Sequence, residues 1–203
     1  MKRFHKITAS CLLIAVVVGF SAFLYAVEIS ENDTVHAGRH NNQKKLVRDE
    51  NGRIYLVYSH YDESEAQWKI YYTESDDGTT WNEPVSPWSD AYYYPSIAID
   101  SSGNIHLVMV KSAGIYYSKK TSSWSSPEKV NTSGSSWTAP SIAVDSNKKP
   151  HIAWSQDSGG AEIFYSSRTS SGWCVPVNVS ASSPTGSLQP QVLIDVENKI
   201  YIP

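Results

Sequence analysis

A repeated motif built around an aspartate constrains this chain more than any other feature of its sequence. Four segments align without a gap, and in each a short apolar run ends at an aspartate, three turn residues follow, and a second alternating run begins. The spacings between successive aspartates are 51, 45 and 50 residues. The four aspartates are Asp49, Asp100, Asp145 and Asp195. Each segment therefore predicts a β-hairpin with the aspartate at its turn.

A second motif follows the hairpin in three of the repeats. An aromatic run enters a turn rich in Ser, Thr and Gly, a tryptophan follows, and a proline stands three residues later. The tryptophans are Trp81, Trp124 and Trp173. With the short Val-containing run that closes each unit, one repeat comprises four strands of about five residues. A period of 45 to 51 residues with four strands predicts a β-propeller blade, because a single sheet cannot bury both faces alone. A β-sandwich is the alternative, and in a propeller each tryptophan should be buried at its blade edge.

The repeats do not complete a propeller. Residues 28–203 hold about three and a half units, and the last stops inside its second strand. We therefore expect an all-β partial propeller of four-stranded antiparallel blades, a fragment of one with about six or seven blades. An open arc and closure by oligomerisation are the alternatives.

The first 27 residues form a separate segment. Lys2, Arg3 and Lys6 precede a run of 21 residues without charge, Ile7 to Val27, which predicts a hydrophobic helix. Such a segment is typical of a signal peptide, and it is also long enough to anchor the chain in a membrane. Either interpretation places residues 28–203 outside the cytoplasm, secreted or anchored.

Composition excludes several classes of protein. The net charge is −3, with 17 basic and 20 acidic side chains, which offers no basic surface for nucleic acid. Only one cysteine outside the leader, Cys174, is present, so a disulfide scaffold is excluded and this thiol should be buried and inert. We expect neither a cofactor nor a metal. His106 and His151 share a repeat position with Tyr55 and Tyr201, which favours a packing role over metal binding.

One turn carries a family resemblance. Residues 74–81, Glu-Ser-Asp-Asp-Gly-Thr-Thr-Trp, resemble the Asp-box, Ser/Thr-x-Asp-x-Gly-x-Thr-Trp. Its defining positions hold Asp76, Gly78, Thr80 and Trp81, while Glu74 replaces Ser or Thr. The chain from about residue 27 onward thus resembles the Asp-box (BNR-repeat) sialidase-like β-propeller superfamily. The resemblance implies a structural turn, far from the active site, in which the Asp76 carboxylate accepts turn N–H groups.

The resemblance does not extend to the sialidase reaction. Sialidases bind the substrate carboxylate with arginines, the first in a Phe/Tyr-Arg-Ile-Pro motif, and use a Tyr–Glu nucleophile pair with an aspartate as acid/base. Asn42 and Lys44 stand at the Arg and Pro positions here. Arg39 is the nearest arginine, and Asp62 is the candidate acid/base. Because the nucleophile pair belongs to later blades, we expect no sialidase turnover from this chain.

In the propeller superfamily, ligands bind where the first strand of each blade begins. The loops that lead there are aromatic, and aromatic faces beside polar groups suit sugars. The candidate ligand-binding residues are Arg39, His40, Trp88, Tyr92, Tyr93, Tyr94 and Trp137. These rings would also pack the loops between blades, and that alternative stays open.

Three functions are compatible with the sequence. The leading hypothesis is an extracytoplasmic propeller that binds a glycan or another surface polymer. The second is the N-terminal part of a sialidase-type glycoside hydrolase, an exo-sialidase-like glycosidase. The third is a structural surface propeller that binds a protein. Membrane contact would come through residues 7–27 if the leader is retained.

Overall fold

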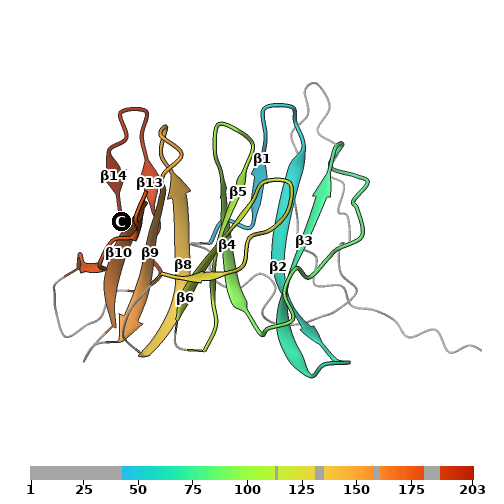
Figure 1. Cartoon of the computed structure of the whole chain (residues 1–203), viewed down its shortest axis with the longest axis horizontal. Helices are drawn as coiled ribbons and strands as arrows, with labels where there is room; N and C mark the ends of the chain where they lie inside the picture. Colours follow the sequence, from blue (N-terminus) through green and yellow to red (C-terminus); the bar gives the residue numbers. More distant parts are fainter. Residues whose placement is uncertain (1–42, 113, 131–134, 158–160, 181–187) are drawn as a thin grey trace, which may run out of the picture.

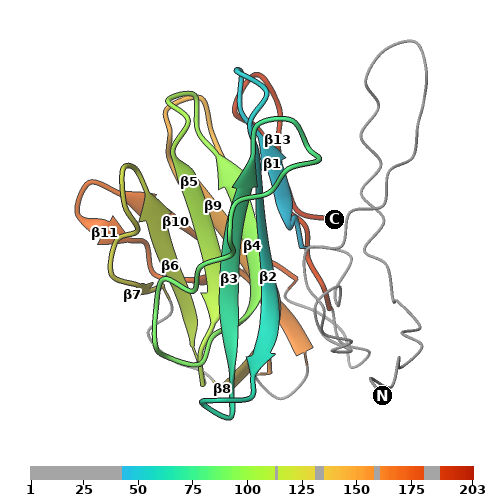
Figure 2. The same ribbon diagram turned by 90° about the vertical axis from the view of Figure 1, so that its right-hand side faces the viewer.

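The structure, a computed structural model, describes residues 43–112, 114–130, 135–157, 161–180 and 188–203, with the backbone alone for residues 135–138 and 157. Every element in these residues is a β-strand, and no helix occurs among them. The strands form three antiparallel sheets and a final hairpin, which stand side by side in chain order (Figure 1). Figure 2 looks along this stack with the first sheet in front. The all-β class predicted from the repeat is confirmed.

Each sheet corresponds to one repeat. The first contains β1 (Leu46–Arg48), β2 (Ile54–Asp62) and β3 (Gln67–Ser75). The second contains β4 (Tyr93–Ile99), β5 (Ile105–Val110), β6 (Ile115–Lys120) and β7 (Glu128–Lys129). The third contains β8 (Ser135–Val144), β9 (Pro150–Asp157), β10 (Ala161–Thr169), β11 (Gly172–Trp173) and β12 (Val177–Asn178). The hairpin is β13 (Leu193–Ile194) with β14 (Ile200–Tyr201).

The fourth strand expected in the first repeat is reduced to a single bridge between Tyr72 and Val85. Two prolines flank this segment, Pro84 and Pro87. Because proline has no N–H to donate, longer pairing is blocked on both sides of Val85. The second sheet therefore has the four strands expected per unit, the third has four with the two-residue β11 in addition, and the first has three.

The repeated aspartate closes the turn between the first two strands of each unit. Its Oδ1 accepts the backbone N–H groups two and four residues later in all four units. The fourth turn residue has a positive φ, at Gly52 (95°), Gly103 (76°), Lys148 (65°) and Asn198 (63°). Glycine adopts this conformation without steric cost, so the turn geometry prevails over residue preference in the last two units. Asp100 and Asp145 thus lie at equivalent turns, as predicted.

Successive sheets pack their apolar faces together. Val57 and Tyr72 of the first sheet pack with Leu107 and Met109 of the second. On its other face the second sheet contributes Val108 to a cluster with side chains of the third sheet, among them Ile142, Ile152 and Trp154. Since Leu107, Val108 and Met109 are all fully buried, the middle sheet is covered on both faces, and this explains its continuous apolar run.

The repeated tryptophans connect neighbouring sheets. Trp124 meets the ring of Tyr72 edge-on at 5.3 Å between centroids, and Trp173 meets Tyr117 in the same way at 5.1 Å. Trp81, Trp124 and Trp173 are each half-buried, whereas the sequence predicted full burial. Trp124 and Trp173 lie at the outer edges of their sheets, so only part of each ring reaches the preceding sheet. Cys174, predicted to be buried, is exposed because the segment after Trp173 runs along the outer edge of its sheet.

The first strands begin with a backbone irregularity. Tyr94, Ala139 and Gln189 have φ of 53°, 54° and 60°, and each directly precedes the proline of its unit. The pairing register shifts at the same place in β4 and β8. These bulges turn the chain as it enters each sheet.

No helix long and apolar enough to cross a membrane occurs in the described part of the chain. The leader and hydrophobic helix predicted for residues 1–27 lie outside the described residues, as do Arg39 and His40.

Candidate functional site

The sheets have two chemically different ends. At the Asp-turn end lie the turns that begin at Asp49, Asp100, Asp145 and Asp195, at the top of Figure 1. At the opposite end lie the β2–β3 hairpin, the starts of β4 and β8, and residues 43–45.

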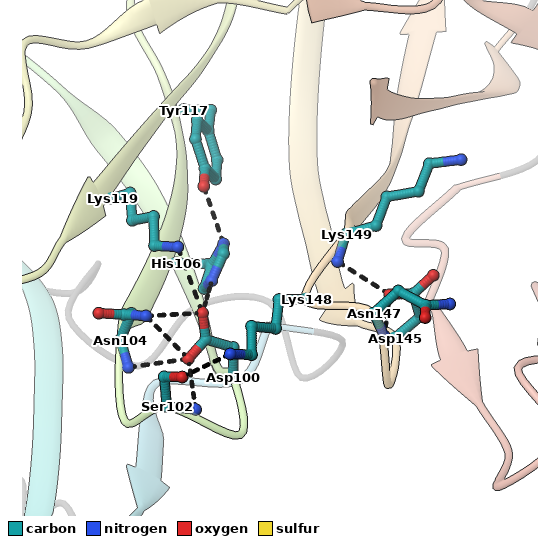
Figure 3. Close-up of polar contacts among 10 residues, drawn as sticks. All are labelled: Asp100, Ser102, Asn104, His106, Tyr117, Lys119, Asp145, Asn147, Lys148 and Lys149. Carbon is teal, nitrogen blue, oxygen red and sulfur yellow. Dashed lines mark hydrogen bonds and ion pairs between the residues drawn. The ribbon is translucent and has the colours of Figure 1, made fainter. Parts of the chain in front are cut away.

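Asp100 is the most heavily bonded aspartate of the Asp-turn end (Figure 3). Its carboxylate accepts hydrogen bonds from Nδ2 of Asn104, from Nζ of Lys119 at 3.2 Å and from Nε2 of His106 at 3.1 Å. Burial opposes ionisation of Asp100, but the hydrogen bonds from Asn104, His106 and two backbone amides prevail and hold its pKa well below the usual range. Asp100 is therefore an anion at any physiological pH.

His106 extends this contact into the core. Its Nδ1 lies 2.8 Å from the hydroxyl of Tyr117. Because Asp100 is an acceptor only, Nε2 carries the ring proton and Nδ1 accepts from Tyr117. Burial, more than any charge, lowers the pKa of His106, so the ring is neutral at pH 7.

The other units make the same contact with different residues. His151 lies between Asp145 at 3.4 Å and Tyr165 at 2.6 Å. In the first and fourth units a tyrosine hydroxyl replaces the imidazole and donates to the aspartate, Tyr55 to Asp49 at 2.9 Å and Tyr201 to Asp195 at 3.0 Å. A contact that recurs in every unit locks the turn, and the packing role predicted for His106 and His151 agrees with this geometry. No group of three or more side chains in the described residues is placed to hold a metal ion.

The Asp-box turn differs from the expectation in one residue. Asp77, not Asp76, accepts the backbone N–H groups of Thr79 and Thr80, at 2.7 and 2.6 Å, and also bonds the Thr80 hydroxyl. Asp76 instead pairs with Arg53 at 2.6 Å on the surface. The backbone N–H groups of Thr80 and Thr79 hold the pKa of Asp77 well below its usual range. Gly78, at φ 76°, donates its N–H to Ser75, so the capping pattern begins one residue later than the resemblance implies.

The grooves at the Asp-turn end suit sugars poorly. One of about 410 Å³ lies between the first two aspartate turns. It is lined mainly by polar residues, with Ile99 as its one large apolar side chain and no aromatic ring. Its lining includes Arg48, Asn51, Ser101 and Ser102. Without an aromatic face for a sugar to stack on, this groove offers mainly hydrogen bonds, which water also supplies.

At the opposite end, Lys45 and Gln43 connect three units. The Lys45 ammonium donates to Oε1 of Gln43 at 2.7 Å and to the carbonyl of Pro95 at 2.6 Å. The Gln43 amide donates to the carbonyls of Tyr94 at 2.6 Å and Pro140 at 3.3 Å. Within the described part of the chain no carboxylate pairs with Lys45, and burial lowers its pKa to about 7. The sequence analysis missed both residues, although Lys45 stands at a repeat position that holds Ser96 and Ser141 in the next units.

Asp62, the candidate acid, is fixed as an anion. It accepts the Ser64 hydroxyl at 2.6 Å and the Ser64 backbone N–H at 3.0 Å, and it pairs with Lys69 at 3.1 Å. The Ser64 hydroxyl and then Lys69 hold the pKa of Asp62 well below its usual range. Lys69 also pairs with Glu65 at 2.5 Å, the contact that most raises the pKa of Lys69. A general acid must carry a proton near neutral pH, and Asp62 does not in this arrangement.

The aromatic candidates divide between packing and surface. Tyr92 is only 3% exposed, and its ring contacts Trp88 at 5.9 Å and Tyr116 at 5.8 Å. Trp88 in turn meets Trp124 at 5.3 Å. Trp88 and Tyr92 therefore belong to the packing between the first two sheets.

Tyr93 and Tyr94 are half-buried, with ring centroids 6.0 Å apart. The hairpin tip adds a second half-buried pair that the sequence analysis did not single out, Tyr61 and Trp68, edge-on at 5.6 Å. For Trp137 the structure describes the backbone, which pairs with Gln156.

No protein-family model matches the chain, and no curated protein matches it. Several solved structures are similar to it. A polysaccharide lyase of family PL25, an ulvan lyase, matches with a TM-score of 0.56 and 18% identity over 75% of this chain and 47% of its own. An α-L-arabinofuranosidase of Fusarium graminearum matches with a TM-score of 0.54 and 12% identity, over 75% of this chain and 49% of its own.

A thermostable family-43 glycoside hydrolase matches with a TM-score of 0.52 and 14% identity, over 75% of this chain and 61% of its own. The chain thus spans less than two thirds of the length of these three proteins. At such identities the likeness establishes the fold, an all-β propeller type, and no more. It supports the propeller class without singling out the Asp-box sialidases.

Proposed function

We propose that the chain is part of an extracytoplasmic β-propeller that binds carbohydrate, a glycan or another surface polymer, at the opposite end of its sheets. The observation that carries the proposal is the set of half-buried rings there, Tyr61, Trp68 and Tyr93. The Tyr61 and Trp68 rings at the hairpin tip are partly exposed, and aromatic ring faces are what the C–H faces of sugars stack on. The fold likeness to a polysaccharide lyase and glycoside hydrolases supports the same proposal.

Binding is favoured over catalysis by the state of Asp62. Its pKa lies well below the usual range, so it has no proton to donate. General acid help alone contributes only about 10²–10⁴-fold to a rate, and no nucleophile pair has been assigned in this chain. The second candidate is the N-terminal part of a glycoside hydrolase, sialidase-type or other, supported by the fold likeness to enzymes that act on carbohydrate.

Binding of the purified full chain to immobilised arabinan, xylan, ulvan and sialylated glycans tests the proposal. We expect at least one glycan to bind, and Tyr61→Ala or Tyr93→Ala to weaken it roughly tenfold, equivalent to about 1.4 kcal/mol. Val196→Ser, at a residue 97% exposed on the Asp-turn end, is the matched control and should leave binding unchanged. Equal loss in all three variants, or no glycan bound, would favour a structural propeller with a protein partner.

Hydrolysis of a fluorogenic sialoside separates binding from catalysis. We expect no turnover from the full chain. Turnover above background that disappears in Asp62→Ala would overturn the preference for binding and make the chain an enzyme.

A further inference from the structure

The packed interface between the second and third sheets, called the joint below, contains a buried histidine, whereas the described residues place none in the joint between the first and second sheets. His106 is 1% exposed and lies between Asp100 and Tyr117. At the equivalent position the first sheet has Tyr55, bonded to Asp49. His60 belongs to the opposite end, where it contacts Tyr71 at 5.5 Å.

In the neutral ring of His106, Nε2–H donates to Asp100 and Nδ1 accepts from the Tyr117 hydroxyl, so each group in this contact is satisfied. A second proton would sit on Nδ1 and turn that nitrogen from an acceptor into a donor. The Tyr117 hydroxyl would have to turn to accept from it, and its own proton would lose Nδ1 as an acceptor. Burying a donor without an acceptor costs free energy, so protonation works against the packed arrangement.

The charges around His106 do not offset the added proton. Among the described residues, Asp100, from the turn after β4, is the single carboxylate in contact with it. The bond from Asp100 raises the pKa of His106, but burial outweighs it, and Asp100 already pairs with Lys119 of β6. Arg168 of β10 faces the same region from the third sheet and adds to the effect of Lys119 in lowering the pKa of His106, after burial as the largest cause. Glu128 of β7 is engaged by Arg168 at 2.7 Å.

Tyr117 transmits any change to the third sheet. Its ring meets Trp173 edge-on, and the indole N–H of Trp173 donates to Glu128 at 3.1 Å. Tyr117, Trp173, Glu128 and Arg168 thus form one contact set across the joint.

We propose that protonation of His106 loosens the joint between the second and third sheets, so that mild acid weakens this joint and leaves the joint between the first and second sheets intact. The unfolded chain takes up the proton at an ordinary histidine pKa of about 6.5, whereas the folded chain does so at lower pH. Because the unfolded state then binds more protons, the free energy of unfolding falls as the pH drops below about 6.5.

Hydrogen exchange of the full chain at about pH 7.5 and about pH 5.5, corrected for the intrinsic effect of pH, tests the proposal. We expect residues 115–129 and 161–173 to exchange several-fold faster in acid, while residues 54–62 and 67–75 do not change. His106→Gln keeps a donor and an acceptor without a titrating group, and should abolish the acid effect in residues 115–129. His60→Gln is the matched control and should retain it.

Equal protection at the two pH values, or an acid effect on residues 115–129 that persists in His106→Gln, would overturn the proposal. Should that variant fail to fold, the ring proton signals of wild-type His106, followed by NMR through the same pH range, decide instead. A midpoint at or above that of an exposed histidine would also overturn it. His151, which makes the same contact in the third sheet, titrates as a separate signal in that experiment.

Discussion

The turn at Asp100 and the hairpin at Asp62 lie at opposite ends of neighbouring sheets, and each contains an aspartate held as an anion. Asp100 is buried and repeats a contact that three other units make. Asp62 is fixed by Ser64 and Lys69 of its own hairpin, a contact that belongs to this unit alone among those described.

The two ends differ in how constant their contacts are from unit to unit, and this difference indicates which end stabilises the fold and which end binds a ligand. At the Asp-turn end, histidine and tyrosine substitute for each other while the hydrogen bond to the aspartate stays, which is the mark of a stabilising role. At the opposite end, the same repeat position holds Lys45, Ser96, Ser141 and Gln191, and the contacts change with the residue. An end where units differ can match one ligand, and this is why we place binding there.

The largest effect should follow from Asp100→Ala. Removing this carboxylate leaves His106, Asn104 and Lys119 without their shared acceptor in a buried place. We expect a loss of about 3–5 kcal/mol in the free energy of unfolding, measured by urea denaturation. Asp90→Ala, which removes an exposed carboxylate that pairs with Lys111 and interacts with Tyr92, is the control. A loss below about 1 kcal/mol would mean that Asp100 contributes no more to stability than an ordinary surface ion pair, and the contrast with Asp62 would then not hold.

An intermediate effect should come from Lys45→Met, and it should depend on pH. The folded-state pKa of Lys45 is about 7, while an unfolded lysine titrates at about 10.4. Between these values the unfolded chain binds more protons, so the stability of the wild type should rise with pH from about 7 to about 10. Denaturation across this range should show the rise in wild type and a flatter profile in Lys45→Met. Identical profiles would mean that the ammonium is solvated and does not join the three units.

The smallest effect distinguishes two adjacent aspartates. Asp77→Ala removes three bonds to Thr79 and Thr80, whereas Asp76→Ala removes one exposed ion pair with Arg53. We expect a lower Tm for Asp77→Ala and a Tm close to wild type for Asp76→Ala, since exposed ion pairs contribute little. The reverse order would restore Asp76 as the capping residue of this turn.

The repeat let the sequence predict the strands, their order and the aspartate turns. The prediction succeeded because each turn is local: the carboxylate bonds amides two and four residues away, and the period fixes the next unit. It failed for the fourth strand of the first sheet, because Pro84 and Pro87 together limit the pairing to one bridge. It also failed for Cys174, whose exposure depends on which edge of the sheet stays uncovered.

Only the tertiary structure decided the roles of the aromatic and charged side chains. Trp88 and Tyr93 are both partly buried, yet Trp88 packs against the cluster between the first and second sheets and Tyr93 against the cluster between the second and third. The contacts of Gln43 with Tyr94 and Pro140 join residues 51 and 97 positions apart. Local pattern determines turns and periodicity, whereas burial and the pKa of Lys45 arise from the stacking of distant units, which no short segment encodes.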